Sequence, residues 1–253
     1  MPRRRRVDTK GIVFHAMNRG AKRARLFNTA WDYAAFESLI GEAKTEVPIS
    51  LFAYCVMPNH WHLVILGHAD GDLSQFLHWL TGTHAKRWNA FHDSTGSGAV
   101  YQARFKSSPV QSDHHLLRLI RYVERNPLRA NLVGKAEDWR WSSLWRRCHA
   151  CDAGLLDEWP IPPPVDWLKI VNTPETEGEL SSLREAITRG APLGDDEWRT
   201  RTAQMLGIES SLRPLGRPRR KTTPDPFSAE AISAAPKTTP DPFFRRSEPI
   251  DRP

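Results

Sequence analysis

The chain has 253 residues, 40% of them hydrophobic, which suffices for one packed core with an appendage. Its formal net charge of +7 and pI near 9.6 indicate a polyanionic partner, either nucleic acid or an anionic membrane surface. No apolar run approaches the roughly 18 residues of a membrane span, and no apolar segment follows the basic start MPRRRRVD, so a cytoplasmic protein is expected.

Composition divides the chain into three parts. Residues 1–150 alternate apolar segments with short turns, as a folded catalytic domain does. Residues 151–213 are poorer in apolar residues and contain the proline-rich connector WPIPPPVDW, so a partly helical extension that supports DNA binding is expected there. Residues 214–253 lose hydrophobic periodicity and carry the segment KTTPDPF twice, which favours a disordered tail.

The first predicted element is a strand at 11–18, which ends at the turn-forming residues NRG. A helix follows, and Asn28 is placed as its N-cap. The helical period rests on residues that recur at four-residue steps, namely Trp31, Ala35, Leu39 and Ala43.

A hairpin comes next, with strands at 49–57 and 60–67 around a Pro-Asn turn. A helix is predicted over 72–91. Its apolar face is formed by Leu73, Phe76, Leu77, Leu80 and His84.

The remaining predicted elements are a short strand at 104–111, a helix that starts with Ser112 as its cap, and a late helix at 195–208. The order βαββαβα predicts an α+β fold: a ferredoxin-like antiparallel sheet with helices on one face. The C-terminal extension and the tail then follow this domain.

The hairpin carries two histidines one residue apart. Because residues i and i+2 of a strand point to the same side, His60 and His62 project together, while Trp61 and Leu63 face the core. Two neighbouring imidazoles can share a divalent cation. A pair of histidines satisfied by ordinary hydrogen bonds remains the alternative at this point.

A tyrosine stands out on the helix that begins near Ser112. The apolar stripe of that helix consists of Leu116, Leu119, Ile120 and Val123. Tyr122 lies off this stripe, with Arg118 and Asn126 one turn away on either side. A phenol beside arginines can attack a phosphodiester and conserve the bond as a phosphotyrosine, whereas a partly buried tyrosine with a solvated hydroxyl is the alternative. An Asn126 oxygen could complete a metal site, although Pro127 disfavours helical geometry just before it.

Five segments in this order resemble the HUH single-strand DNA transposases with one catalytic tyrosine, and more narrowly the bacterial REP-associated tyrosine transposases. The segments are FHAMNRG (14–20), YCVMPNHWHLVI (54–65), RFKSSPV (104–110), LIRYVERNPLRANLV (119–133) and WRWSS (139–143). The resemblance covers residues 11 to about 145.

This resemblance implies a role for each matching residue. Tyr122 matches the nucleophile, and His60, His62 and Asn126 match the ligands of Mg²⁺ or Mn²⁺. The implied reaction cleaves single-stranded DNA beside a palindromic repeat hairpin, through a 5′-phosphotyrosine link and a free 3′-hydroxyl. A monomer and a homodimer both remain open, and the location implied for such a protein is cytoplasmic and nucleoid-associated.

DNA contacts are expected from basic residues near these segments. The candidates are His15, Arg19, Lys22, Arg23, Arg25, Arg118 and Arg129, with Arg217, Arg219 and Arg220 of the segment GRPRR, which resembles an AT-hook core. Lys86, Arg87 and Trp88 could in addition meet phosphates and stack a base, and for each basic residue a solvated charged face is the alternative.

Two other functions are alternatives. A nucleic-acid-binding regulator derived from a transposase would bind without cutting, but both histidines, the tyrosine and the asparagine are present. A zinc hydrolase would need further ligands, and a structural zinc site at Cys148 and Cys151 would need a second pair where only Cys55 remains. The three cysteines fit a reducing compartment without a disulfide framework.

Overall fold

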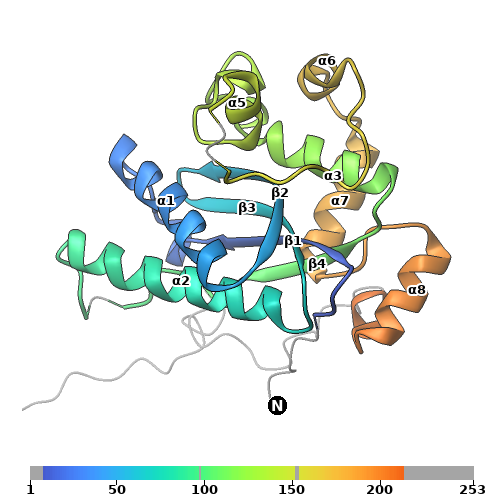
Figure 1. The fold of residues 1–253 in the computed structure, drawn as a ribbon, viewed down its shortest axis with the longest axis horizontal. Helices are drawn as coiled ribbons and strands as arrows, with labels where there is room; N and C mark the ends of the chain where they lie inside the picture. The colour runs from blue at the N-terminus through green and yellow to red at the C-terminus, as the bar shows by residue number, and fades with distance from the viewer. Residues whose placement is uncertain (1–7, 97, 152–153, 214–253) are drawn as a thin grey trace, which may run out of the picture. The chain divides into compact units, whose positions relative to one another are not determined.

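Four antiparallel strands form one sheet in the order β2–β3–β1–β4 (Figure 1). This computed structural model describes residues 8–96, 98–151 and 154–213, all within one compact unit. The strands are β1 (Val13–Arg19), β2 (Ile49–Met57), β3 (His60–Gly67) and β4 (Lys106–Val110). The predicted α+β fold with a ferredoxin-like sheet is therefore confirmed.

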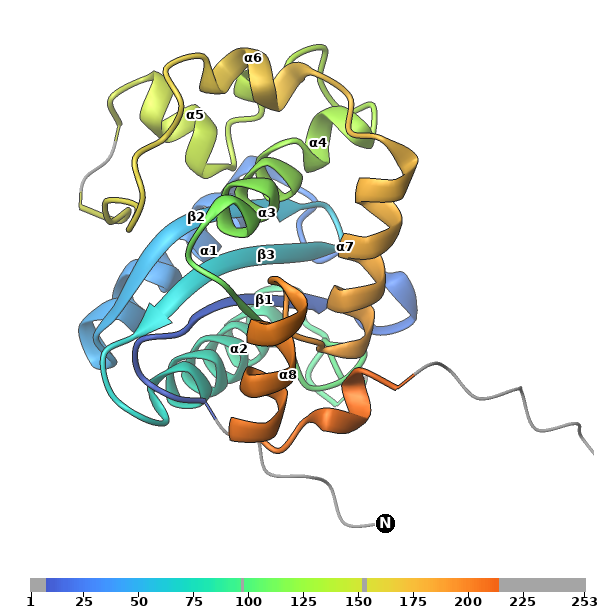
Figure 2. The same cartoon turned by 90° about the vertical axis from the view of Figure 1, so that its right-hand side faces the viewer.

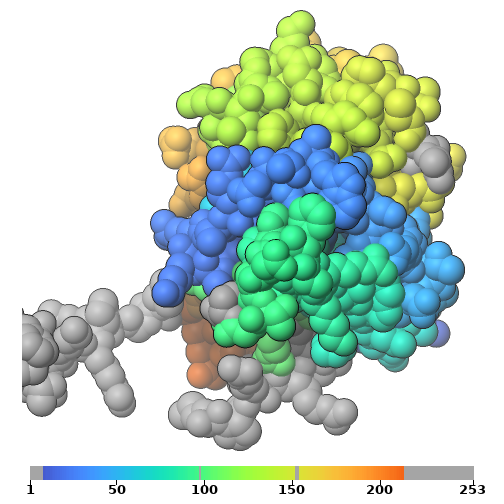
Figure 3. Space-filling view, turned by 90° about the vertical axis from the view of Figure 1, so that its left-hand side faces the viewer, coloured from blue at the N-terminus to red at the C-terminus, as the bar shows by residue number. Residues whose placement is uncertain are grey.

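Helices cover both faces of the sheet, so the expectation of helices on one face is wrong. On one face lie α1 (Ala30–Glu46) and α2 (Asp72–Phe91), side by side in Figure 3; on the other lie α3 (His114–Glu124) and α7 (Glu177–Arg189) (Figures 1 and 2). The reason is visible in β2, whose residues are buried almost without alternation. A strand that is apolar on both sides needs a layer on each side.

Two predicted helix caps lie one residue too early. Thr29, not Asn28, caps α1, because Thr29 and Asp32 form a reciprocal capping box. Asp113, not Ser112, caps α3. The expected stripe of α1 is also wrong at Trp31, which is 61% exposed. Its core face consists of Tyr33, Phe36, Leu39, Ile40 and Ala43.

The helical face predicted for α2 is confirmed in full, since Leu73, Phe76, Leu77, Leu80 and His84 are its buried hydrophobic or aromatic residues. The helix with Tyr122 divides near Pro127 into α3 and α4 (Asn126–Arg129). The late predicted helix is α8 (Asp196–Met205). The helix α5 (Ser143–Cys148) was not predicted. Two more helices, α6 (Trp167–Asn172) and α7, lie in the extension that the sequence indicates only as partly helical, without bounds.

The connector before α6 is fixed to the edge of the sheet. Asp157 accepts hydrogen bonds from the Leu51 backbone N–H and from Lys44 Nζ, both at 2.6 Å. The Trp159 indole N–H donates to the Phe52 carbonyl at 2.8 Å. These bonds hold the C-terminal extension against β2. Among the described helices, none is both long and apolar enough to cross a membrane.

His84 gives the first testable prediction, because it is a buried histidine in the α1–α2 core. Burial lowers the pKa of His84 to about 4. Its Nδ1 lies 2.8 Å from the Tyr101 hydroxyl, which already accepts from the Trp61 indole N–H and so donates its proton to the histidine. Protonation of His84 Nδ1 would remove the acceptor of this bond.

Acid should therefore destabilise the wild-type protein through His84. The unfolded chain takes up this proton near pH 6.5 and the folded chain only near pH 4, so the unfolded state binds more protons between these values. Relative to His84→Gln, the free energy of unfolding should fall by up to about 1.4 kcal/mol per pH unit from pH 6.5 to 4. Urea unfolding of both proteins across this range tests it, and parallel curves would contradict it.

Candidate active site

The two histidines of the hairpin lie at the start of β3, directly after the Pro-Asn turn. Trp61 between them is fully buried against Phe36 in the α1 layer, as predicted. The rings of His60 and His62 stand side by side on the opposite face, with centroids 5.0 Å apart. The alternation of the strand thus brings the two imidazoles to one surface of the sheet.

Each of the two histidines has a partner on Nδ1. The Asn59 side-chain oxygen lies 2.7 Å from His60 Nδ1 and can only accept, so this nitrogen carries the proton. His62 Nδ1 lies 2.8 Å from Nε2 of His15 on β1. These bonds orient both rings. The His60 Nε2 atom is left as a ligand atom, and so is that of His62 in the tautomer whose Nδ1–H donates to His15.

Burial keeps these imidazoles neutral. Burial, with smaller contributions from Arg19 and Arg129, lowers the pKa of His60 to about 4. Burial lowers the pKa of His15 to about 3 and that of His62 well below its ordinary value. Neutral nitrogen lone pairs are what a divalent cation requires. His15 is only 1% exposed, so it lies beneath His62 rather than at the surface expected for a DNA contact.

Tyr122 faces the histidine pair from α3. Its ring centroid lies 6.0 Å from that of His62, in an edge-to-face arrangement. The Arg129 guanidinium lies 4.2 Å from the centre of the Tyr122 ring. Tyr122 is 8% exposed, so its departure from the apolar stripe turns it toward the sheet and the histidines rather than toward open solvent.

Two buried donors near this surface have no partner among the described residues. One is Asn126 Nδ2, one turn beyond Tyr122, and the other is Nε of Arg19, which pairs across the sheet with His60. A buried polar atom without a partner costs about 1–3 kcal/mol, and such atoms collect where a ligand binds. Both are N–H donors, so they fit an acceptor such as a phosphate oxygen. A divalent cation would instead take the two imidazole nitrogens and the side-chain oxygen of Asn126.

Sequence reasoning missed the segment that holds this helix in place. Glu175 accepts hydrogen bonds from Arg129, at 3.3 and 3.4 Å, and pairs with Arg125 at 3.3 Å. Arg125 also donates to the carbonyls of Val171 and Asn172, and Arg121 donates to those of the next two residues. Arginines at four-residue spacing on α3 and α4 were the available signal. Their common partner was not visible in the sequence.

The basic loop after β1 is exposed and adjoins the histidines. Gly20 allows it, because a Cβ there would lie 2.3 Å from the Ala24 carbonyl oxygen. Lys22 and Arg23 take positive φ angles of 52° and 64°, and Arg25 is exposed beside them. The loop bonds back to the Pro-Asn turn through the Gly20 and Leu26 amides. Its three cationic side chains are therefore exposed to solvent at the histidine end of the sheet, where a nucleic-acid strand could reach them.

The expected contacts from α2 are not supported. Arg87 forms a two-pronged ion pair with Glu42, and the Trp88 indole N–H donates to the Leu26 carbonyl. Both side chains thus stabilise the α1–α2 layer, on the face of the sheet opposite Tyr122. Lys86 is exposed in that same layer. The AT-hook-like residues Arg217, Arg219 and Arg220 and both KTTPDPF segments lie outside the described residues.

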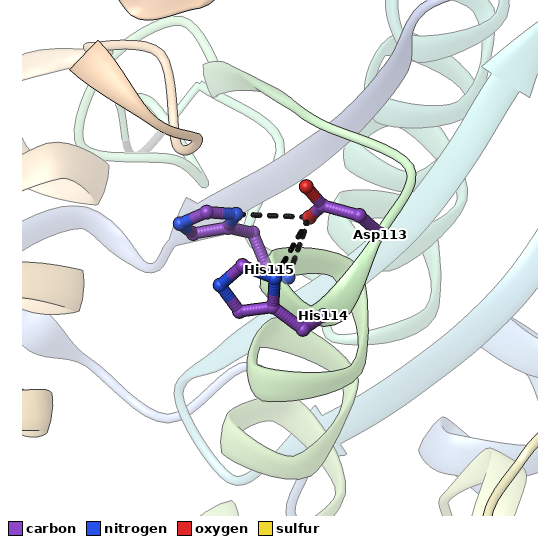
Figure 4. A group of neighbouring side chains, drawn as sticks. All are labelled: Asp113, His114 and His115. Atoms are coloured by element: carbon purple, nitrogen blue, oxygen red, sulfur yellow. Dashed lines mark hydrogen bonds and ion pairs between the residues drawn. The ribbon is translucent and has the colours of Figure 1, made fainter.

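Asp113, His114 and His115 form a second cluster of metal-ligand types at the start of α3 (Figure 4). Asp113 Oδ1 lies 2.9 Å from His115 Nδ1 and 3.8 Å from His114 Nδ1. The same oxygen accepts the His115 backbone N–H as the helix cap. Helix capping accounts for this arrangement. Cys148 and Cys151 are exposed and free, and Cys55 is buried.

Comparison with known proteins identifies relatives of this chain. Residues 8–126 match the sequence family described as Transposase IS200 like. A REP-associated tyrosine transposase of Escherichia coli (strain K12) is 24% identical over 162 residues, which cover 62% of this chain and 84% of the relative. The expected resemblance to this branch is therefore confirmed.

One solved structure is similar over much of the chain: a REP-associated tyrosine transposase bound to a REP hairpin. It covers 70% of this chain and 99% of its own, with 18% identity and a TM-score of 0.48.

Proposed function

We propose a function from one premise: residues 8–126 form a domain of the Transposase IS200 like family. The protein is a single-strand DNA endonuclease and strand transferase that acts beside palindromic repeat hairpins. The observation that carries this proposal is the contact between Tyr122 and His62. Their ring centroids lie 6.0 Å apart, although Tyr122 comes from helix α3 and His62 from strand β3. A hairpin substrate is supported by the relative that is bound to a REP hairpin.

In the proposed step, the Tyr122 hydroxyl loses its proton and attacks the phosphorus of a phosphodiester. The new bond joins Tyr122 Oη to phosphorus, the bond from phosphorus to the 3′ oxygen breaks, and that oxygen takes up a proton. The strand with the 5′ phosphate stays on the protein, and a 3′-hydroxyl can later attack the phosphotyrosine to rejoin the ends. Since the tyrosine ester conserves the bond, no nucleotide cofactor is needed.

The surrounding residues would orient the phosphate and the nucleophile. Arg129 holds the Tyr122 ring by its face, and the unpaired Arg19 Nε can donate to a phosphate oxygen. His60, His62 and Asn126 would hold Mg²⁺ or Mn²⁺, which supplies charge neutralisation for the phosphate when bound. His15 fixes the orientation of His62 from beneath.

The metal assignment makes a specific prediction. His60→Ala and His62→Ala should each lower the affinity for Mn²⁺ by at least about tenfold, because each removes a ligand nitrogen. Titration calorimetry with Mn²⁺ alone, without DNA, measures this. His114→Ala is the control, since it changes the exposed cluster at the start of α3. Loss of affinity in the control alone would move the metal to that cluster.

The experiment that tests the function is a covalent trapping assay. The protein is incubated with Mn²⁺ and single-stranded hairpin oligonucleotides from the flanks of its gene, labelled on the 3′ side. A labelled protein band that survives SDS and disappears with chelator supports the proposal. Tight binding without any adduct would instead favour the non-cleaving regulator.

A further inference from the structure

A polar cavity of about 270 Å³ lies between α3, α7 and α8, and most of its lining residues come from the C-terminal extension, beyond the segment that matches the transposase family. Figure 2 shows α7 and α8 beside α3; α7 packs on β4, whereas α3 packs on β2 and β3. The link between α7 and α8 is bonded to the β4 edge of the sheet, because Leu193 donates to the Pro109 carbonyl and accepts from the Gln111 amide. The C-terminal extension therefore builds this cavity together with α3.

The cavity is lined by more cations than anions. Three arginines contribute to its wall, Arg118, Arg189 and Arg199, against one carboxylate, Glu185. Within the described part of the chain, Arg118 has no ion pair or hydrogen bond, and the one ion pair of Arg199 is with Asp196, whose side chain is 99% exposed. A solvent-exposed partner screens a guanidinium weakly, so the wall is available to an anion.

Ser211 adds an independent observation. Its Oγ is buried and makes no hydrogen bond to any residue that the structure describes. Ser211 is one of the residues that line the same cavity as Arg118 and Arg199. A buried hydroxyl without a partner is unfavourable unless a ligand satisfies it, and it can donate to an anionic oxygen. Cations and an unsatisfied hydroxyl around one cavity fit a phosphate group.

Two lining residues of the cavity, His115 and Arg118, lie on the face of α3 that carries Tyr122. Arg118 lies one turn before Tyr122, and His115 lies two turns before it. At 1.5 Å per residue, these offsets are roughly 6 and 10 Å along the helix axis. Stacked nucleotides rise about 3.4 Å each, so this span equals two or three nucleotides of one strand. A strand with its reacting phosphate at Tyr122 can thus bring a neighbouring phosphate to the cavity.

We propose that this cavity is a phosphate-binding subsite, which holds the DNA strand two or three nucleotides away from the phosphate at Tyr122. The assignment rests on the proposed function of Tyr122. Free phosphate shares the same chemistry and is the other possible source of the ligand. Arg118, Arg199 and the Ser211 hydroxyl bind the phosphate oxygens.

The test compares two arginines of α8, of which Arg199 lines the cavity and Arg201 does not. Arg199→Gln removes a lining residue. Arg201→Gln removes an exposed arginine that also pairs with an acidic residue of its own helix but does not line the cavity. The probe is a labelled DNA hairpin with single-stranded thymidine extensions, measured by fluorescence anisotropy at several salt concentrations.

Arg199→Gln should weaken binding of this probe about threefold to tenfold, the net effect of one ordinary hydrogen bond at a partly exposed side chain. The dependence of log affinity on log salt should become shallower by about 0.7, as for one lost phosphate contact on a single strand. The same hairpin without extensions should bind Arg199→Gln and wild type alike. Equal binding of the extended probe by Arg199→Gln and Arg201→Gln would overturn the strand assignment.

Ser211→Ala separates a ligand role from a structural one. Deletion of an unsatisfied hydroxyl should leave thermal stability unchanged or higher, while affinity for the extended probe falls. A loss of stability with unchanged affinity would assign Ser211 to structure and count against the subsite.

A second arm distinguishes this proposal from the proposed function. Thermal unfolding is followed in inorganic phosphate and in chloride of equal ionic strength. Wild-type protein that binds no hairpin probe would contradict the proposed function, whereas stabilisation by phosphate that is lost in Arg199→Gln would still support a phosphate site. Stabilisation by phosphate with unaltered strand binding would assign the cavity to free phosphate. If phosphate does not stabilise the protein and Arg199→Gln does not change strand binding, the proposal of a phosphate-binding subsite is overturned.

Discussion

Tyr122→Phe should abolish the covalent protein–DNA adduct and lower strand cleavage by at least about 10³-fold, because it removes the attacking oxygen. The affinity for the hairpin probe should stay within about twofold of wild type, since the aromatic ring, its contact with His62 and the Arg129 guanidinium above it all remain. Stability should change little, as no hydrogen bond of the Tyr122 hydroxyl is observed among the described residues. Gel electrophoresis in SDS and anisotropy measure the two quantities on one preparation.

The matched control is Tyr101→Phe, which also removes one phenolic oxygen but on the opposite layer. Tyr101 bonds His84 and Trp61 and lies in the α1–α2 core, so this variant should lose stability and keep adduct formation. Adduct formation by Tyr122→Phe would show that another residue attacks the phosphate. Loss of hairpin affinity in Tyr122→Phe would indicate instead that the hydroxyl is a binding group.

The sequence predicted the histidine hairpin with the correct bounds for both strands because its information is local. The Pro-Asn turn sets the register, and the apolar residues that alternate with His60 and His62 set their common face. The same reasoning identified Tyr122 as a residue off the apolar stripe. It could not determine what the tyrosine faces, because that depends on which side of the sheet α3 covers.

The contacts that complete the site connect residues far apart in sequence. His15 supports His62 across 47 positions, and Glu175 reaches Arg129 across 46. Glu37, inside a helix, is tolerated at 5% exposure because Tyr54 and Arg146 donate to it, the latter from 109 positions away. Patterns of short period carry no information on such pairs. By contrast, α7 was predictable, since Thr176 and Glu179 form a capping box before a helical apolar stripe.

The second large effect should come from Glu175→Gln, which removes the acceptor shared by two arginines behind the catalytic helix. The side chain of Glu175 is 3% exposed, and those of Arg125 and Arg129 are 11% and 17% exposed. Neutralising the carboxylate leaves two largely buried guanidinium groups without a counter-charge, which should lower the free energy of unfolding by about 3 kcal/mol. Burial already lowers the pKa of Arg125, so this cation depends on its partner. Urea unfolding at neutral pH measures the loss.

Glu197→Gln is the control, because it breaks an exposed pair with Arg201 within α8 and should change stability by less than about 0.5 kcal/mol. Glu175→Gln and Glu197→Gln also allow the effect on stability to be separated from the effect on adduct formation. Arg129 both pairs with Glu175 and lies over the Tyr122 ring, so its release should move the nucleophile. A displacement of about 1 Å can cost up to 10²-fold in rate, and adduct formation should fall in Glu175→Gln under conditions where the protein is still folded. Equal stability of the two variants would show that the arginines reach solvent or other acceptors. A stability loss with unchanged adduct formation would show that Tyr122 is positioned by the packing of α3 on β2 and β3 alone.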